Sequence, residues 1–244
     1  MAKPSASATL DTGNSLYANM LYIWPFLEGS GATAADYKDG NDASLLIGSW
    51  QTVAAGPIWQ NHTVIVSPTL PIISVTPFVL GNTNINWSVA WGVDQLHDDD
   101  NGMICGDITD ANSYIWQSGG NFLRLNDGAV SNFTGVTSFT GYHDYLMTGD
   151  FLLGVHNDIH LYVDGTEVSG SPISNQIGNL TINSLASGFS GSLNFTGDFY
   201  YLYVWNARVL DGTDAATLHS DPYSIFVSGG GPTFVSKLAS LGVG

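Results

Sequence analysis

The stretch DFYYLYVW, from Asp198 to Trp205, has an aromatic or aliphatic residue at every position after Asp198. In a β-strand, successive side chains point to opposite faces of the sheet, and one face is usually polar. Here one set of alternate residues is Phe199, Tyr201, Tyr203 and Trp205, and the other set is Tyr200, Leu202 and Val204. We therefore expect a cover of some kind over both faces of this strand.

Short apolar runs separated by turn residues continue through the rest of the chain. A single convincing helix is expected near GTDAATLHSD, with Asp211 or Thr213 as its cap. Many short strands with almost no helix predict one all-β domain, a sandwich or a barrel. The runs that read as strands are 44–50, 63–81, 85–93, 102–108, 113–118, 121–125, 144–156, 159–165, 180–185 and 198–210.

The charge balance excludes two classes of partner. Five basic residues face 21 acidic ones among 244 residues, which gives a formal net charge of −16. Nucleic acids and anionic membranes attract the opposite charge, so neither is expected as a partner. Cys105 is the single cysteine, which excludes an intrachain disulfide and a cysteine-based zinc site. Its apolar neighbours indicate a small buried core residue.

Three segments together resemble a known family. They are LYIWPFLEGSGATAADYKDGNDASL (21–45), IHLYVDGTEV (159–168) and FTGDFYYLYVWNARVLDGTDAATLHSDPYSIF (195–226). In this order they resemble laminin-G-like domains of the concanavalin A-like jelly-roll class. The resemblance implies an all-β, two-sheet antiparallel jelly-roll sandwich with one short C-terminal helix. It divides the chain into an N-terminal arm (1–15), the sandwich (16–227), and a Gly-rich hinge with a C-terminal tail (228–244).

The same resemblance guides the functional expectation. Members of this class are mostly binding modules, some are glycoside hydrolases, and domains with short arms occur in bacteriophage structural genes. The hydrolases of this fold use a Glu-x-Asp-x-(x)-Glu strand, and hydrolysis needs two carboxyl groups across the sugar. This chain has only Glu28 and Glu167, in separate turn-like segments. We therefore expect a protein that is not an enzyme.

The family pattern also indicates which way the two faces of the strand at 198–205 point. Leu202 and Val204 align with the apolar pair that faces the sandwich core, which sends the aromatic set to the other side of the sheet. An aromatic face can stack on sugars or contact a subunit. The predicted carbohydrate-binding or subunit-interface residues are Phe199, Tyr201, Tyr203 and Trp205.

Two polar clusters carry further hypotheses. In LHDDDNGMICGDITD (96–110), the carboxylates of Asp98, Asp100 and Asp107 are candidate calcium ligands, because calcium prefers oxygen donors in a flexible loop. EF-hand spacing is absent, and the same residues also simply favour turns. His156 and His160 are expected on either side of a tight turn at Asn157-Asp158, as surface residues rather than metal ligands. A second hairpin turn is expected at Asp164-Gly165.

We therefore expect a non-enzymatic structural subunit of a virion or other surface assembly, such as a capsid decoration or tail-associated protein, with a capacity to bind glycans. Its expected partners are other copies of itself, virion structural proteins and glycans. The N-terminus lacks the apolar region of a secretory signal peptide, so synthesis in the cytosol and a final place on the assembly surface are expected. The alternative is a free carbohydrate-binding module, which is calcium-dependent if the acidic stretch binds the ion. No cofactor is otherwise expected to be required.

Overall fold

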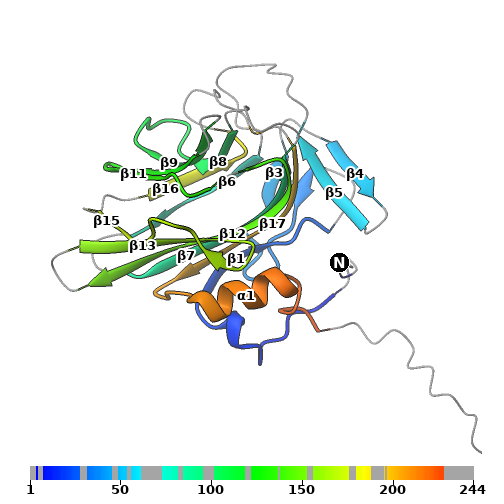
Figure 1. Ribbon diagram of the computed structural model, residues 1–244. Helices are drawn as coiled ribbons and strands as arrows, with labels where there is room; N and C mark the ends of the chain where they lie inside the picture. Colours follow the sequence, from blue (N-terminus) through cyan, green and yellow to red (C-terminus); the bar gives the residue numbers. More distant parts are fainter. Residues whose placement is uncertain are drawn as a thin grey trace, which may run out of the picture.

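The chain folds into two stacked antiparallel β-sheets in a computed structural model (Figure 1). The expected all-β two-sheet sandwich with one short C-terminal helix is confirmed. Among the described residues, no helix has the length and apolar character needed to cross a membrane. The described residues are 4, 8–27, 32–45, 49–53, 56–61, 73–81, 85–95, 102–118, 122–136, 138–152, 156–175, 180–187, 195 and 197–227.

The larger sheet has nine described strands, with β17 near its middle. Its path runs β14-β13-β12-β7-β17-β5-β4, while β1 pairs with β17 and β15 pairs with β13. The bounds are β1 Met20–Trp24, β4 Ser49–Val53, β5 Gly56–Asn61, β7 Trp87–Gln95, β12 Gly141–Leu152, β13 His156–Val163, β14 Thr166–Glu167, β15 Ile173–Asn175 and β17 Gly197–Asn206.

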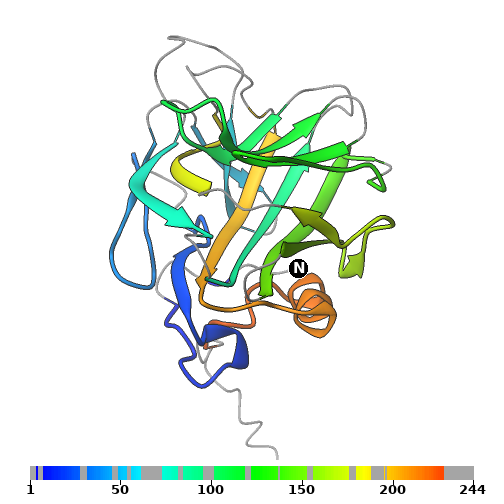
Figure 2. The same ribbon diagram turned by 90° about the vertical axis from the view of Figure 1, so that its left-hand side faces the viewer.

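The smaller sheet has eight described strands in the order β11-β10-β9-β8-β16-β6-β3-β2. Its bounds are β2 Thr33–Ala34, β3 Ala43–Leu45, β6 Ile73–Leu80, β8 Gly102–Gly106, β9 Ser113–Ser118, β10 Phe122–Asp127, β11 Val130–Phe133 and β16 Leu180–Leu185. Figure 2 shows the two layers packed against each other.

The main apolar core lies between the two sheets. Leu202 and Val204 belong to it, as the family pattern predicted, and so do Trp87 and Trp91 from alternate positions of β7. The Trp91 ring stacks on Tyr145 of β12 with centroids 5.1 Å apart. Cys105 is fully buried in this core, and burial raises the pKa of its thiol to about 12.

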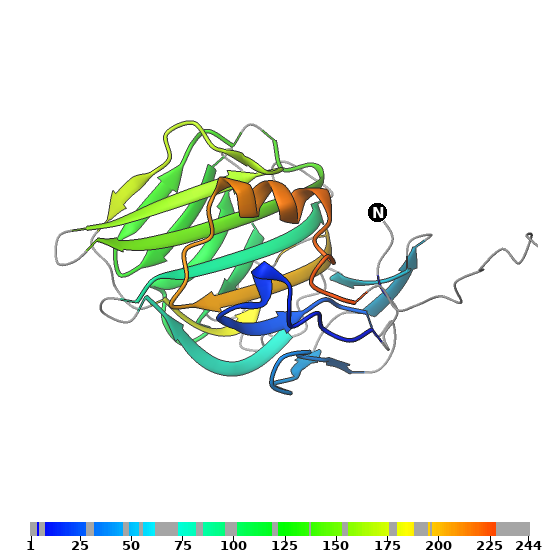
Figure 3. The same cartoon turned by 90° about the horizontal axis from the view of Figure 1, so that it is seen from below.

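A second apolar cluster lies on the outer face of the larger sheet. The N-terminal segment, including the 3-10 turn η1 (Ser15–Tyr17), and helix α1 (Gly212–Ser220) lie across this face (Figure 3). Leu10 bridges to Phe226, which ties the two ends of the described chain together over the sheet. Leu16, Leu218 and Ile225 bury their side chains in this cluster. The part of the outer face that carries this cluster is therefore covered by the chain itself.

Helix α1 begins at the N-cap Asp211, one of the two caps expected from the sequence. Its carboxylate accepts hydrogen bonds from the backbone N–H groups of Thr213 (2.7 Å) and Asp214 (3.1 Å). Asp214 in turn accepts from the backbone N–H of Asp211, which completes a capping box. The cap fixes where the chain leaves β17 and turns back over the sheet.

The turn predicted at Asn157-Asp158 is wrong. His156–Val163 is one continuous strand, β13, which pairs with β12 along its whole length. Strand β15 pairs with Asn157 and Asp158 along the edge of β13 that faces away from β12. Ser174 donates a hydrogen bond to the Asp158 carboxylate at 2.7 Å. His156 and His160 therefore belong to the same strand.

Candidate functional site

The first candidate is the aromatic set of β17, and one of its members faces the wrong way for the prediction. A register shift between Phe199 and Tyr201 interrupts the alternation against β7. Such a bulge places two residues of one strand opposite one of its partner. Phe199 therefore joins the core between the sheets, where its ring lies 4.8 Å from that of Phe195. The expectation that Phe199 shares a face with Tyr201 is wrong for this reason.

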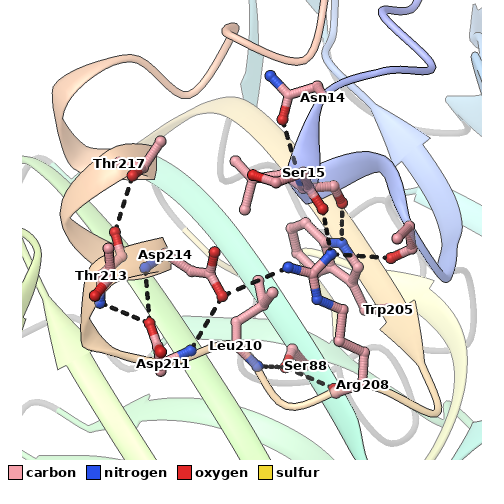
Figure 4. Close-up of polar contacts among 12 residues, drawn as sticks. Asn14, Ser15, Ser88, Trp205, Arg208, Leu210, Asp211, Thr213, Asp214 and Thr217 are labelled. Carbon is pink, nitrogen blue, oxygen red and sulfur yellow. Dashed lines mark hydrogen bonds and ion pairs between the residues drawn. The ribbon is translucent and has the colours of Figure 1, made fainter.

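The other three aromatic residues do lie on the outer face, and we call them the covered strip: Tyr201, Tyr203 and Trp205. All three are completely buried within the single chain. Tyr201 and Tyr203 stack with centroids 4.7 Å apart. The indole N–H of Trp205 donates to the backbone carbonyl of Leu16 at 2.6 Å (Figure 4). In this structure the strip is packed core, with no ring face left for a sugar or a second subunit.

Arg208 holds the cover of the strip in place. Its guanidinium Nη1 donates to the backbone carbonyls of Ser15 (2.6 Å) and Ala18 (3.1 Å), and Nη2 lies 3.6 Å from the Asp214 carboxylate (Figure 4). Bonds from a charged donor are stronger than neutral ones. One side chain thus joins the N-terminal segment, the end of β17 and helix α1.

The second candidate is the acidic stretch, and only part of it is described. Asp98 and Asp100 lie outside the described residues. The Asp107 carboxylate oxygen Oδ1 accepts from the Thr109 N–H (2.8 Å), the Thr109 hydroxyl (2.7 Å) and the Asn183 amide (2.7 Å). Burial works to raise the pKa of Asp107, but these hydrogen bonds together lower it. Asp107 thus closes a turn and links it to β16, and calcium binding in this stretch stays a prediction.

The third candidate was not singled out as a site from the sequence. A cleft of about 250 Å³ opens beside the β13–β14 hairpin, and we call it the hairpin cleft. Asp164 and Gly165 form the hairpin turn with φ values of 50° and 74°, as the turn residues Asp-Gly favour. The cleft is lined by Gly135, Val136, Ser138, His143, Val163, Asp164, Thr166, Glu167, Val168 and Ser169.

Close backbone packing shapes one wall of the hairpin cleft. A Cβ on Gly135 would lie 2.4 Å from the Ser169 carbonyl oxygen and 2.6 Å from the Val168 side chain. Such distances are far shorter than van der Waals contact, so only glycine fits here. Val136 and Val168 are buried and give the cleft an apolar wall, while Thr166 and Glu167 are exposed at its rim. The cleft therefore combines an apolar wall with a hydrogen-bonding rim.

Two histidine–carboxylate pairs flank the cleft. His143 Nδ1 lies 2.7 Å from Asp164 Oδ2, and its Nε2 lies 3.3 Å from the Thr140 carbonyl. His160 Nδ1 lies 2.7 Å from Glu167 Oε1, which also accepts from the Ser171 hydroxyl at 3.0 Å. These contacts restrict the rotamers of the polar groups that line the cleft.

A third histidine joins this region from helix α1. His219 Nδ1 lies 2.7 Å from Oδ2 of Asp144, a buried carboxylate on β12. Burial raises the pKa of Asp144 despite the opposing effect of His219. The hydrogen bond that His219 makes to the Asp144 carboxylate raises the pKa of His219. Asp144 and Asp164 are joined through the backbone, since each main-chain N–H donates to an oxygen of the other residue.

Part of this region was predictable from the sequence. The hairpin at Asp164-Gly165 was predicted from its turn residues and is confirmed by the pairing of β13 with β14. The two histidines that contact Asp164 and Asp144 are His143 on β12 and His219 on α1, which are distant from each other in the sequence. The pairing of β12 with β13 and the packing of α1 bring these histidines and aspartates together. No local sequence motif could therefore have indicated that they are neighbours.

Comparisons with known proteins agree on the fold. No protein-family model matches the chain, and no curated protein matches its sequence. Domain 4 of AbnA, a GH43 extracellular arabinanase from Geobacillus stearothermophilus solved with arabinotriose, aligns over 82% of this chain and 98% of that domain. Its TM-score is 0.57 at 14% sequence identity.

A sialidase from Trypanosoma rangeli, solved with the inhibitor DANA, aligns over 85% of this chain with a TM-score of 0.55 and 12% identity. The chain spans about a third of that sialidase, 34% of its length. At such low identity these likenesses bear on the fold alone. They support the β-sandwich that the resemblance implied, and the bacteriophage context stays a prediction.

Proposed function

We propose that the chain is a non-enzymatic carbohydrate-binding sandwich and that the hairpin cleft is its sugar site. The observation that carries the proposal is the composition of the cleft. Its polar side chains include His143, Thr166 and Glu167, and its apolar wall includes Val136 and Val168. A sugar presents hydroxyl groups around its rim and C–H groups on its ring faces. The cleft offers a complementary partner for each.

The volume of the cleft limits the size of the ligand that it can bind. Its volume of about 250 Å³ lies just below the range of about 300–1,000 Å³ that drug-sized ligands occupy. One sugar unit, or the end of a glycan chain, suits such a space. The likeness to an arabinanase domain solved with arabinotriose makes arabino-oligosaccharides the first probe.

The hydrogen-bond pattern favours binding over chemistry. Glu167 accepts from Ser171 and pairs with His160, so the exposed carboxylate is held as a fixed acceptor. Fixed polar groups lose little conformational entropy when a ligand binds. We therefore propose no hydrolytic role, and an assay for sugar release from arabinan and β-glucan tests this directly.

A glycan array tests the cleft as the binding site. The variant Thr166→Trp fills the cleft from an exposed position on β14, and Thr33→Trp places the same bulk on exposed β2 of the other sheet. We expect the wild type and Thr33→Trp to bind the same glycan and Thr166→Trp to lose at least tenfold in affinity. An array on which the wild type binds nothing, or on which Thr166→Trp binds equally well, overturns the proposal.

The assembly role expected from the sequence is a separate proposal. It rests on the resemblance to domains of bacteriophage structural genes, since the covered strip that was to meet another subunit is closed by the chain itself. Sedimentation of material from the native source, with the chain followed by mass spectrometry, tests it. Movement with a large particle supports a virion or surface-assembly role, and movement with small soluble proteins rejects it.

A further inference from the structure

Beyond the sugar site, one group of side chains has the composition of a metal site. Asp144 on β12, Asp164 in the hairpin turn and His219 on α1 each offer one ligand atom, and these atoms all lie within 4.8 Å of one another. We call these three residues the Asp–His cluster. They come from three separate elements and converge on one point. We propose that the Asp–His cluster binds a zinc ion.

The distances allow a single ion to be reached by all three groups. Nitrogen and carboxylate ligands lie about 2.0–2.2 Å from zinc in a tetrahedral arrangement, so two ligand atoms of one ion are about 3.4 Å apart. The widest separation here is 4.8 Å or less, and His219 Nδ1 already lies 2.7 Å from Asp144 Oδ2. The widest gap must therefore close by up to about 1.4 Å, which movements of about 1 Å in each side chain achieve.

The donor set selects the kind of metal. Calcium and magnesium take oxygen ligands almost exclusively, whereas zinc accepts imidazole nitrogen together with carboxylate oxygen. Two carboxylates with one imidazole fit zinc and leave its fourth position for water or for a ligand hydroxyl. Because Asp164 also lines the hairpin cleft, a bound ion lies at the edge of that cleft.

The surrounding contacts hold the carboxylates in place before a metal arrives. The backbone N–H of Asp144 donates to Asp164 Oδ1 at 3.2 Å, and the backbone N–H of Asp164 donates to the Asp144 carbonyl at 2.9 Å. His143 Nδ1 lies 2.7 Å from Asp164 Oδ2 and orients it. Metal ligands commonly have such supporting partners, whose loss weakens metal affinity by about 10–100-fold.

Gly165 sets the position of the helix that carries the imidazole. Its φ is 74°, and a Cβ there would lie 3.1 Å from both the Ala216 Cα and the His219 Cβ. The hairpin turn and the last turn of α1 therefore touch directly. This contact accompanies the placement of His219 Nδ1 within 4.8 Å of a ligand atom of each carboxylate.

Calorimetric titration of Zn²⁺ into the full chain tests the site. The protein is prepared without a histidine tag, treated with a chelator and measured near neutral pH in the absence of sugar. The variant His219→Ala removes one ligand from an exposed helix position, and His160→Ala is the matched control. His160 makes a histidine–carboxylate pair of the same 2.7 Å length, but it lies outside the cluster.

We expect the wild type and His160→Ala to bind one zinc ion per chain, and His219→Ala to bind at least 100-fold more weakly. His143→Ala is expected to lose about 10–100-fold as a supporting residue. A wild type that does not bind zinc overturns the proposal. So does a His219→Ala variant with unchanged affinity, or a His160→Ala variant that loses binding to the same extent. Since no sugar is present, the result is independent of the glycan array.

Discussion

The covered strip and the hairpin cleft lie on the same large sheet, yet they have opposite relations to solvent. The strip has the residue types of a sugar platform, and it is completely buried. The residues that line the cleft form no recognisable sequence motif, and its rim residues Thr166 and Glu167 are exposed. Residue type alone therefore does not mark a binding surface. What decides is which part of the sheet the chain ends cover.

The register of the sheet shows how the cover is fitted. Tyr203 lies opposite Ala90, and Trp205 lies opposite Ser88, on the neighbouring strand β7. The Ser88 hydroxyl donates to the Arg208 carbonyl and accepts from the Leu210 N–H, both at 3.0 Å. Small residues on β7 thus leave room for large rings on β17. The polar hydroxyl among them is satisfied by the chain that crosses above it.

Breaking the strip is expected to have the largest effect on stability. Trp205→Ala removes a fully buried indole and its hydrogen bond to the Leu16 carbonyl. We expect the free energy of unfolding to fall by about 3–5 kcal/mol, the usual cost of emptying such a site. Denaturant unfolding measures it. A loss below about 1 kcal/mol, within the range of surface substitutions, contradicts the assignment of the strip to the core.

A larger side chain in the wall of the cleft is expected to have the second-largest effect on stability. Gly135→Ala brings a methyl group against the Ser169 carbonyl and the Val168 side chain, so the backbone must shift. We expect a loss of about 1–3 kcal/mol in the free energy of unfolding, together with weaker glycan binding. The control is Gly13→Ala, where the nearest atom lies 3.3 Å away at an exposed turn. Equal effects of the two changes would show that the wall is not tightly packed.

Loosening the cover without emptying the core is expected to have an intermediate effect. Arg208→Ala removes the donors to the carbonyls of Ser15 and Ala18. Hydrogen bonds from charged groups contribute about 1.5–3 kcal/mol, and exposure at the rim reduces this, so we expect about 1–2 kcal/mol. Hydrogen exchange should rise in residues 8–19. Unchanged exchange there would mean that Arg208 does not hold the N-terminal segment.

The sequence predicted the sheets well and the surfaces poorly, for a physical reason. The family resemblance placed Leu202 and Val204 in the core, and the turn residues placed the Asp164-Gly165 hairpin; both placements are correct. The bulge that turns Phe199 inward depends on pairing with β7, which no local pattern of β17 records. The cover over Trp205 depends on Leu16, far away in the sequence. Such long-range contacts decide which surfaces stay open.

Removing the N-cap of helix α1 is expected to have the smallest effect on stability. Asp211→Ala should cost about 1 kcal/mol. Backbone hydrogen bonds from Asp214 and Thr213 lower the pKa of Asp211, so its contribution is present above the unfolded pKa and is lost as the pH falls through the lower folded value. Thermal unfolding of wild type and variant should therefore differ at neutral pH and converge in strong acid. A difference that grows in acid would contradict this role.

The central claim is that ligands meet the hairpin cleft while the strip stays packed. Titration of the ¹⁵N-labelled chain with the best glycan from the array, with arabinotriose as the first probe, tests it most directly by NMR. The account predicts amide shifts concentrated in residues 135–143 and 163–169, with residues 201–205 unmoved. Shifts centred on residues 201–205 would show that the cover opens to a sugar and would contradict the account.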